Sequence, residues 1–478
     1  MSYEKLELLI AGEFRGGSEG KTEPVVNPAT EEVLGDVPYA SAADLDSALA
    51  ASVDGFNVWR AKTPFQRQVV MEKAARLMED RIDAIARTLT MEMGKPLAEA
   101  KAELQFVIDC TRWYGEEGKR AYGRLVPARA PGVRQMVVKE PVGPTCAFVA
   151  WNFPGVNVIR KIAGALGAGC SIVIKPSEET PGTAVAIARC FQDAGLPAGV
   201  LNVVFGNPDV VSRHILGSWI PRKVSFTGSI PVGKHLLKLA ADTVKRATME
   251  LGGHAPVIIF DDADVNRALN MMAGFKFRNA GQVCISPTRF YVQDAVYKNF
   301  VQGFTERAKG VKVGNGLEDG VTMGPLVAAR RLEVMENFVA DARNNGAEVT
   351  TGGERIGNRG YFYAPTVIKD VPDSAKIMSQ EPFGPLAPIT HFNTFDEVVE
   401  RANSLPFGLA SYVFTSDGGK AVKISDALEA GLVGVNTPFV STPDTPFGGV
   451  NESGYGSEGG IEGLDAFLRT KFVVETGV

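Results

Sequence analysis

The chain has 478 residues, of which 45% are hydrophobic and 22% charged, and its formal net charge is −5. This composition is ordinary for a globular protein, and the length indicates two or three domains. Lysine and arginine are scattered among the acidic residues without a basic block, which argues against a nucleic-acid partner.

The N-terminal segment and the hydropathy argue against a membrane protein. No apolar run reaches the roughly 18 residues that cross a bilayer. Glu4, Lys5 and Glu7 stand where a signal peptide would need an apolar stretch. We therefore expect a cytoplasmic protein without a membrane partner.

Cysteine and histidine usage argues against two further kinds of site. The five cysteines are an odd number at wide spacing, which fits neither a disulfide framework nor a zinc site. The four histidines form no HExxH pair. We expect no metal centre.

Helical and extended patterns follow one another along the chain. Apolar residues recur at three- and four-residue intervals over residues 43–122, which predicts helices. Residues 123–144 read as a β-hairpin, because prolines and a glycine separate two β-prone runs. The segment 470–475 is typical of an edge strand that pairs with the hairpin or with another subunit.

Between these segments, short apolar runs alternate with helical patterns. Strands are predicted at 146–150, 171–174, 201–205, 224–226, 257–260, 411–414 and 433–435. Helices are predicted at 158–166, 183–193, 209–216 and 231–241. This alternation indicates βαβ units around a parallel sheet, and such sheets bind ligands at the carboxyl ends of their strands.

Two glycine patterns have competing interpretations. Gly454, Gly456 and Gly459 spell GxGxxG, but no strand is predicted before them, so a flexible loop is favoured over a dinucleotide fingerprint. Residues 228–234 spell GxxxxGK between a predicted strand and a predicted helix. His235 stands where a P-loop has Ser or Thr. The favoured ligand of this helix N-terminus is a dinucleotide pyrophosphate, and a phosphate-binding NTPase is the alternative from another class.

Cys284 differs from the other four cysteines. Those four lie in apolar periodic stretches and are expected to be small buried hydrophobes: Cys110, Cys146, Cys170 and Cys190. Cys284 has Gly281 before it and Pro287 after it, which indicates a turn with exposed backbone. A thiol in such a turn becomes a nucleophile if a base or a positive pocket favours its thiolate. The spacing alone leaves both a catalytic and a structural role open.

Seven motifs resemble those of the NAD(P)-dependent aldehyde dehydrogenase superfamily. They are WNFP at 151–154, KPSE at 175–178, FTGS at 226–229, MELGG at 249–253, GQVC at 281–284, EPFGP at 381–385 and PFGG at 446–449. Each motif alone is weak, but all seven in this order and spacing are highly specific. The resemblance covers nearly the whole chain.

The resemblance implies an α/β fold in three parts. A doubly wound dinucleotide-binding domain would cover 1–122 and 142–252, and a second α/β catalytic domain would cover 253–445. A small β oligomerisation element would combine 123–141 with the C-terminal segment 446–478. The resemblance also implies a homodimer or homotetramer, since closed symmetric assemblies are the commonest oligomers.

The catalytic roles implied by the resemblance fall on three residues. Cys284 would attack the aldehyde carbonyl to give a thiohemiacetal, and Asn152 with the Cys284 backbone N–H would donate to the oxyanion. After hydride transfer to the nicotinamide, Glu250 would activate the water that hydrolyses the thioester. Without the family, Asn152 reads as a turn residue and Glu250 as a solvated strand end. Glu250 favours hydrolysis over the alternative of thioester release to coenzyme A. A binding or structural protein with this fold would usually have lost one of the three.

The cofactor site implied by the resemblance has nine residues: Trp151, Lys175, Ser177, Glu178, Gly228, Ser229, Gly233, Glu381 and Phe383. Glu178 would accept hydrogen bonds from the ribose hydroxyls of NAD and repel the 2′-phosphate of NADP. NAD is therefore expected to be preferred, while Lys175 and movement of Glu178 would still admit NADP. Ala150 departs from the family, where many relatives carry proline.

The substrate residues implied by the resemblance are Phe153, Arg160, Arg278, Ser441 and Thr442. The two arginines match positions where the succinate-semialdehyde branch binds the substrate carboxylate, although an isolated arginine is usually a solvated surface charge. A guanidinium group binds a carboxylate through two parallel hydrogen bonds. We expect an ω-carboxy semialdehyde, with succinate semialdehyde first and 2-oxoglutarate semialdehyde next. A broad aliphatic or aromatic aldehyde is the alternative.

Overall fold

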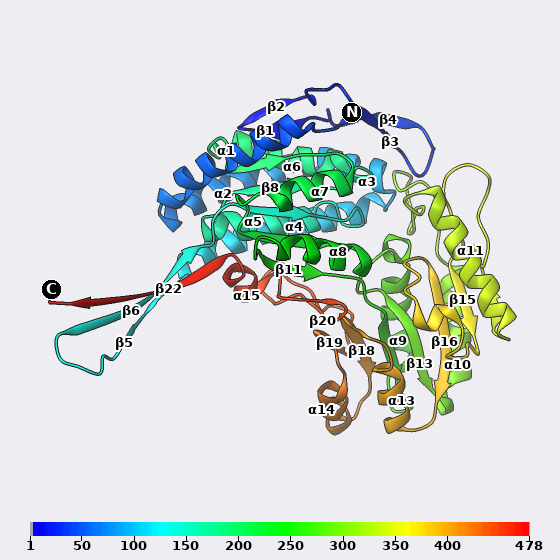
Figure 1. The fold of residues 1–478 in the computed structure, drawn as a ribbon. Coiled ribbons are helices and arrows are strands. Elements are labelled where there is room, and N and C mark those ends of the chain that lie inside the picture. Colours follow the sequence, from blue (N-terminus) through cyan, green and yellow to red (C-terminus); the bar gives the residue numbers. More distant parts are fainter. Residues whose placement is uncertain (1–2, 478) are drawn as a thin grey trace.

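The computed structural model describes residues 3–477, which form two large β-sheets, each with its own hydrophobic core (Figure 1). The first sheet has the order β2-β1-β9-β8-β7-β10-β11-β21. Its strands are β1 (Leu8–Ile10), β2 (Glu13–Arg15), β7 (Thr145–Phe148), β8 (Ile172–Lys175), β9 (Leu201–Val203), β10 (Lys223–Thr227), β11 (Arg246–Glu250) and β21 (Gly454–Tyr455).

The direction of the strands fixes where this sheet can bind a ligand. The five strands from β9 to β11 in the sheet order run parallel. The chain moves outward from β7 through β8 to β9, and then returns to place β10 on the other side of β7. The topological switch point therefore lies between β7 and β10, where doubly wound sheets bind their ligands.

Helices pack on the first sheet in two groups. One group joins α5 and α6 with α2, α3 and α4, and the other joins α1, α7 and α8. Their bounds are α1 (Ala42–Ala61), α2 (Pro64–Asp80), α3 (Ile82–Met93), α4 (Leu97–Glu117), α5 (Val156–Ala168), α6 (Pro181–Asp193), α7 (Pro208–Gly217) and α8 (Ile230–Ala241), and the 3₁₀ helix η1 (Gly118–Arg120) follows α4. Capping boxes begin α1 at Ser41 and α2 at Thr63, so side chains satisfy the first free N–H groups.

The second sheet has the order β14-β15-β16-β13-β12-β18-β19. Its strands are β12 (Ala255–Ile259), β13 (Pro287–Gln293), β14 (Glu348–Thr351), β15 (Thr366–Lys369), β16 (Leu386–Phe392), β18 (Ala410–Phe414) and β19 (Leu432–Val435). The associated helices are α9 (Val265–Phe277), η2 (Arg278–Gly281), α10 (Asp294–Lys309), α11 (Ala329–Asn344), α12 (Lys376–Ser379), α13 (Phe395–Ala402) and α14 (Gly418–Ala427). All strands except β14 run parallel.

A three-stranded sheet projects from the body, at the left of Figure 1. It consists of β5 (Arg124–Val126), β6 (Val133–Pro141) and β22 (Leu468–Thr476), and β22 pairs with β6 along its full length. The remaining elements are β3 (Thr22–Val26), β4 (Val33–Pro38), β17 (Phe407–Gly408), β20 (Val450–Asn451) and α15 (Gly460–Asp465). Among the described residues, no helix has the length and apolarity to span a bilayer.

The predicted alternation is confirmed, and so is the pairing of the C-terminal strand with the hairpin. Every predicted strand and helix overlaps an observed one within a few residues. The loop predicted at the GxGxxG glycines is wrong in part, because Gly454–Tyr455 pairs with β11 and Gly459 precedes α15. The strands β11 and β13–β16 have no counterpart in the prediction.

Candidate active site

A left-handed turn sets the position of Cys284. The three residues 279–281 have φ values of 50°, 53° and 71°, in a region that L side chains rarely adopt. A Cβ on the last of them would collide with the carbonyl group of Gly384, so only glycine fits there. The Gln282 side chain donates to the carbonyl of Asn279 at 3.0 Å and thereby closes the turn.

Cys284 lines a cavity of about 280 Å³ between the two large sheets. Asn152 follows β7 and Glu250 ends β11, so the first sheet supplies both. Cys284 lies just before β13 and Glu381 lies between α12 and β16, so the part of the chain around the second sheet supplies these two. The remaining lining residues are Ala150, Trp151, Thr227, Gly228, Ser229, Leu251, Gly252, Arg331 and Phe383. The three residues with predicted catalytic roles thus face one cavity.

The acidic groups of this cavity have shifted pKa values because they are buried. Burial raises the pKa of the Cys284 thiol well above its ordinary value, and the neighbouring Glu250 carboxylate raises it further. Burial also raises the pKa of Glu250 to about 7, with Glu458 adding to the shift and Lys161 opposing it. The pKa of Glu381 rises to about 8 through burial. Glu250 can therefore bind or release a proton near neutral pH.

A second cavity of about 890 Å³ adjoins the first, because four residues line both: Ala150, Trp151, Thr227 and Gly228. Lys175, Ser177 and Glu178 also line the larger cavity, and the Lys175 ammonium forms an ion pair with the Glu178 carboxylate. Helix α8 begins beside it at Ser229 without a side-chain cap, which leaves N–H groups for an anion. The volume lies in the range of small-molecule sites. These features fit an elongated ligand with a phosphate group at the switch point.

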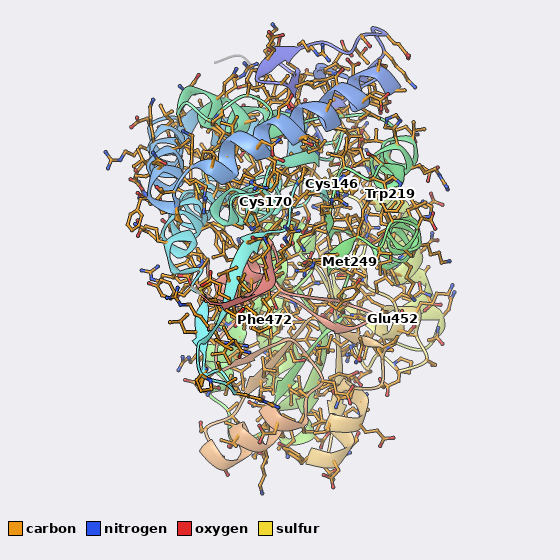
Figure 2. All side chains as sticks on the ribbon, turned by 60° about the vertical axis from the view of Figure 1, so that its left-hand side comes forward. Cys146, Cys170, Trp219, Met249, Glu452 and Phe472 are labelled. Carbon is orange, nitrogen blue, oxygen red and sulfur yellow. The ribbon has the colours of Figure 1, made fainter. Side chains whose placement is uncertain are left out.

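Lys234 does not fit the P-loop interpretation of the same turn. Its ammonium pairs with Glu452 at 2.6 Å and does not line the larger cavity. A P-loop lysine reaches the phosphates. Figure 2 shows Glu452 on the C-terminal part of the chain.

Two of the predicted cofactor residues, Trp151 and Phe383, meet with their rings edge to face at 5.5 Å between centroids. Phe383 has a φ of 46°, and Arg331 donates to the carbonyls of Pro382 and Phe383 at 2.5 and 3.1 Å. Arginine contacts thus hold this loop against the Cys284 cavity.

Gly233 lines neither cavity but packs on Leu251, where a Cβ would lie 2.5 Å from a methyl group.

The predicted substrate residues lie outside the lining of the Cys284 cavity. Arg160 is buried, donates to the Ser441 hydroxyl at 2.7 Å and lies 4.0 Å over the Phe447 ring. Its Nε is buried without a hydrogen-bond partner among the described residues. Its charge lowers the pKa values of both Cys284 and Glu250, so it lies within electrostatic reach of the cavity.

Arg278 and Thr442 are placed differently from Arg160. The Arg278 guanidinium lies 5.2 Å from the centre of the Phe153 ring, which follows Asn152 directly. Thr442 is exposed, and its hydroxyl bonds to that of Thr445 at 3.0 Å. Arg160 thus contacts Ser441, and Arg278 lies beside Phe153, whereas the Thr442 hydroxyl bonds to Thr445.

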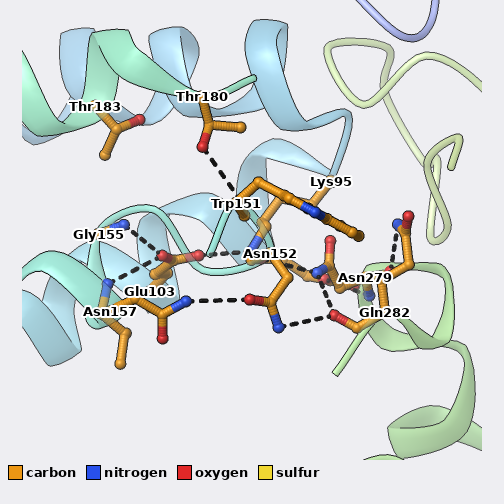
Figure 3. A network of polar contacts seen from close by, with 12 residues as sticks. Lys95, Glu103, Trp151, Asn152, Gly155, Asn157, Thr180, Thr183, Asn279 and Gln282 are labelled. Atoms are coloured by element: carbon orange, nitrogen blue, oxygen red, sulfur yellow. Dashed lines mark hydrogen bonds and ion pairs between the residues drawn. The ribbon is translucent and has the colours of Figure 1, made fainter. Parts of the chain in front are cut away.

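Buried polar groups hold the backbone of Asn152 (Figure 3). Lys95 and the Asn279 amide both donate to the Asn152 carbonyl, at 3.0 and 2.9 Å. Lys95 also pairs at 2.5 Å with Glu103, whose other oxygen accepts from the N–H of Gly155 at 2.8 Å. Because a buried charge needs a partner, this pair fixes the start of α5 relative to α4.

Sequence reasoning missed several residues of this region. Lys161 forms ion-pair and hydrogen-bond contacts with Glu458 and Thr227, and Glu458 acts on the pKa of Glu250. Lys95 and Glu103 fall in a helical segment that reads as a charged surface. The contacts of Lys161 with Glu458, of Lys95 with Asn152 and of Glu103 with Gly155 join residues far apart in the sequence, so no local spacing signals them.

Known proteins are similar to this chain over almost its full length. The model of the "Aldehyde dehydrogenase family" matches residues 14–473. The chain is 45% identical to 4-(hydroxymethyl)benzenesulfonate dehydrogenase TsaD1 of Comamonas testosteroni, with 98% of each chain covered. It is 40% identical to succinate-semialdehyde dehydrogenase [NADP(+)] GabD of Escherichia coli (strain K12), with 98% of this chain and 97% of the relative covered.

A solved structure shows the same fold. The structure of succinate-semialdehyde dehydrogenase from Burkholderia pseudomallei superposes with a TM-score of 0.98 at 40% identity, and the match covers 99% of this chain and 98% of the other. Both the sequence match and the fold extend over almost the full length. The chain belongs to the aldehyde dehydrogenase family, which uses NAD(P), and it is an enzyme that oxidises aldehydes.

Proposed function

We propose that Cys284, Asn152 and Glu250 carry out the oxidation of an anionic aldehyde to its carboxylic acid. The observation that carries this proposal is the convergence of these three residues on one cavity. Cys284 attacks the aldehyde carbon, and a C–S bond forms as the carbonyl oxygen becomes an oxyanion. The side-chain amide of Asn152 and the backbone N–H of Cys284 stabilise that charge, and losing one such donor typically costs about 100- to 1,000-fold in kcat.

Glu250 is the proposed general base of the reaction. Its carboxylate neighbours the Cys284 thiol and can accept the thiol proton as the nucleophile forms. A bound nicotinamide dinucleotide would supply the acceptor for the two electrons that the substrate loses. The proton that Glu250 took from the thiol leaves to solvent, so that the ionised carboxylate can then accept a proton from the water that hydrolyses the thioester. Transfer of this second proton to the departing Cys284 sulfur restores the thiol as the acid is released. One of its oxygens is buried without a partner among the described residues, and this oxygen is available for that water.

The larger cavity is the proposed dinucleotide site, with NAD preferred over NADP. Lys175 and Glu178 would hold the adenosine ribose, and Ser177 lies between them in sequence. Gly228 and Ser229 would face the pyrophosphate at the start of α8, with Gly233 packed beneath. Trp151, Glu381 and Phe383 would hold the nicotinamide half. The negative charge of Glu178 favours ribose hydroxyls over a 2′-phosphate.

The proposed substrate carries its anion at the end remote from the aldehyde. Arg160 has an unpaired buried N–H, a hydroxyl partner in Ser441 and electrostatic reach to Cys284. Arg278 adds a second guanidinium beside Phe153, and Thr442 lies next to Ser441. An ω-carboxy semialdehyde, with succinate semialdehyde first and 2-oxoglutarate semialdehyde next, suits this charge and the small cavity.

A second candidate replaces the carboxylate with a sulfonate. One relative at 45% identity is named for a benzenesulfonate substrate, and a sulfonate offers the same guanidinium groups three acceptor oxygens. The phenyl rings of Phe153, Phe447 and Phe106 around the two arginines would suit an aromatic body.

A panel of aldehydes tests the proposal. NADH formation is followed with succinate semialdehyde, a sulfonated benzaldehyde and an uncharged aldehyde of each length, for the native protein and for the variants Cys284→Ala and Arg278→Ala. We expect Cys284→Ala to abolish turnover, and Arg278→Ala to lower kcat/KM for the anionic members far more than for the uncharged ones. Equal losses for both classes would refute anion recognition, and a fully active Cys284→Ala would refute the mechanism.

The proposed quaternary structure is a homodimer or homotetramer. The projecting sheet, with 123–141 and part of 446–478, would form the contact between copies. The proposed division assigns 1–122 and 142–252 to dinucleotide binding and 253–445 to catalysis.

A further inference from the structure

We infer that Asn157 is a positioning residue that fixes which end of the Asn152 side-chain amide faces the substrate. The inference rests on the proposed role of Asn152 as oxyanion donor. An amide has a donating end and an accepting end of nearly the same shape. Only the donating end can stabilise an oxyanion, so the orientation of this amide matters for catalysis.

A directed chain of hydrogen bonds joins the two asparagines (Figure 3). The Nδ2 group of Asn157 donates to the backbone carbonyl of Ala150 at 3.2 Å and to Oδ1 of Asn152 at 3.1 Å. The Nδ2 group of Asn152 then donates to the backbone carbonyl of Gln282 at 3.2 Å. Both asparagine side chains are buried.

The two backbone carbonyls at the ends of this chain fix its direction. A carbonyl oxygen only accepts hydrogen bonds, so the Ala150 carbonyl requires the NH₂ end of Asn157 and the Gln282 carbonyl requires the NH₂ end of Asn152. Oδ1 of Asn152 is thereby held against Asn157. One N–H of the Asn152 amide bonds to Gln282, and the other is available to the cavity that Asn152 lines with Cys284.

Asn157 is well placed for this role because its own position is fixed. It is the second residue of α5, directly after the segment that Glu103 binds through the N–H groups of Gly155 and Val156. The helix therefore delivers its amide to Oδ1 of Asn152 from a backbone that the buried Lys95–Glu103 pair holds in place.

Two substitutions at position 157 separate this role from general packing. Asn157→Leu removes the donor but leaves the Gln282 carbonyl to orient Asn152, and we expect kcat to fall about fivefold, the value of one ordinary hydrogen bond. Asn157→Asp, when ionised, sets an acceptor against Oδ1 of Asn152 and favours the reversed amide. We expect its kcat to fall about 100-fold, as for loss of an oxyanion donor.

A double-mutant cycle with Asn152→Ala provides the decisive readout, and the melting temperature of each variant reports folding. Once Asn152 is absent, Asn157→Asp should change kcat by less than twofold. The matched controls are Asn266→Leu and Asn266→Asp, since Asn266 is the exposed second residue of α9, and both should keep native kcat.

The inference is overturned if Asn157→Asp retains kcat within twofold of the native value. It is also overturned if the loss is as large in the Asn152→Ala background as in the native one. If Asn152→Ala itself has native kcat, the proposed oxyanion role fails together with the inference. A large loss in Asn152→Ala with none in Asn157→Asp removes the positioning role alone.

Discussion

The buried carboxyl group of Glu250 connects local electrostatics to the pH dependence of the reaction. Its pKa is raised to about 7 because burial disfavours the charged form. The water-activating form is the ionised one, so kcat should rise with pH through about 7 and level off above it. Initial rates of NADH formation at saturating substrate and cofactor, from pH 5.5 to 9, measure this profile.

Glu250→Gln is the matched variant for this profile. An amide has nearly the same shape but cannot accept the proton of water, so hydrolysis should slow by about 100-fold or more. The rate of the stopped-flow burst reports formation of the thioester, and it should fall as well, because Glu250 also accepts the thiol proton of Cys284. If kcat of Glu250→Gln rises near pH 7 in the same way as kcat of the native protein, the ionisation belongs to another group.

The charge of Glu178 should govern cofactor preference. Replacing its carboxylate with an amide in Glu178→Gln removes the repulsion of a 2′-phosphate and leaves the Lys175 side chain beside the site. A Coulomb change of about 1.4 kcal/mol corresponds to tenfold in an equilibrium constant. We expect the ratio of kcat/KM for NADP to that for NAD to rise about tenfold. Steady-state kinetics with each dinucleotide test this, and an unchanged ratio would count against the proposed ribose contact.

At the residue scale, local motifs predict the residues of the candidate site but not the side chains that surround them. The motifs around Cys284 and Glu250 point to both proposed catalytic residues, and the structure adds that their side chains are neighbours in one cavity. Lys161 and Asn157 lie in α5 and read locally as ordinary helical residues. Their partners come from distant parts of the chain, so only the fold reveals them.

At the scale of elements, a carboxylate on one helix caps the N-terminus of another helix. Helix α6 begins after the segment 175–178, which is part of the proposed cofactor site, and it has no side-chain cap of its own at Thr180. Glu92 of α3 accepts instead from the N–H groups of Gly182 and Thr183, at 2.8 and 2.9 Å. Tyr3 also donates to this carboxylate, at 2.6 Å. The N-terminal segment and α3 thus jointly fix the start of α6.

Glu92→Gln should therefore weaken the fold. The new NH₂ group would face N–H donors, and leaving buried groups unsatisfied costs about 1–3 kcal/mol in the free energy of unfolding. We expect a lower melting temperature and a higher KM for NAD, because α6 orients the adjoining loop. Glu400→Gln, on the exposed face of α13, is the control and should match the native protein. Equal melting temperatures for Glu92→Gln and the control would contradict the capping role.

Elements were predictable where the periodicity was strong. The alternation from β7 to α8 appears in the sequence because buried parallel strands are short apolar runs between amphipathic helices. Strand β11 was missed, since its sequence RATME mixes polar and apolar residues. Its parallel pairing with β10 and its buried last three residues make it a strand, so tertiary context decides its conformation.

At the scale of the whole molecule, the projecting sheet has an exposed apolar face. Phe472 and Val474 of β22, two residues apart and therefore on the same face of the strand, are 56% and 50% exposed. Figure 2 shows Phe472 at the front of the molecule on this sheet. An exposed nine-residue strand with apolar side chains is typical of a surface that another chain covers.

Negative charges introduced on the exposed face of β22 should disrupt the proposed contact between copies of this chain. The double variant Phe472→Glu with Val474→Glu places two carboxylates where apolar side chains would be buried, so the mass measured by analytical ultracentrifugation should fall to a smaller multiple of 51.1 kDa. Val422→Glu changes an equally exposed valine on α14 and should leave the mass unchanged. An unaltered mass in the double variant would place the contact between copies elsewhere.

The pairing of β21 with β11 has a consequence for biosynthesis. Gly454 lies opposite Glu250 in that pairing, and Leu464, Phe467 and Leu468 are part of the first core. A nascent chain that has emerged through β11 therefore still lacks the outermost strand of its first sheet. The ribosome must translate some two hundred further residues before that edge can close. Until then the growing polypeptide exposes an open strand, and chaperones that shield such edges would be needed most during this interval of synthesis.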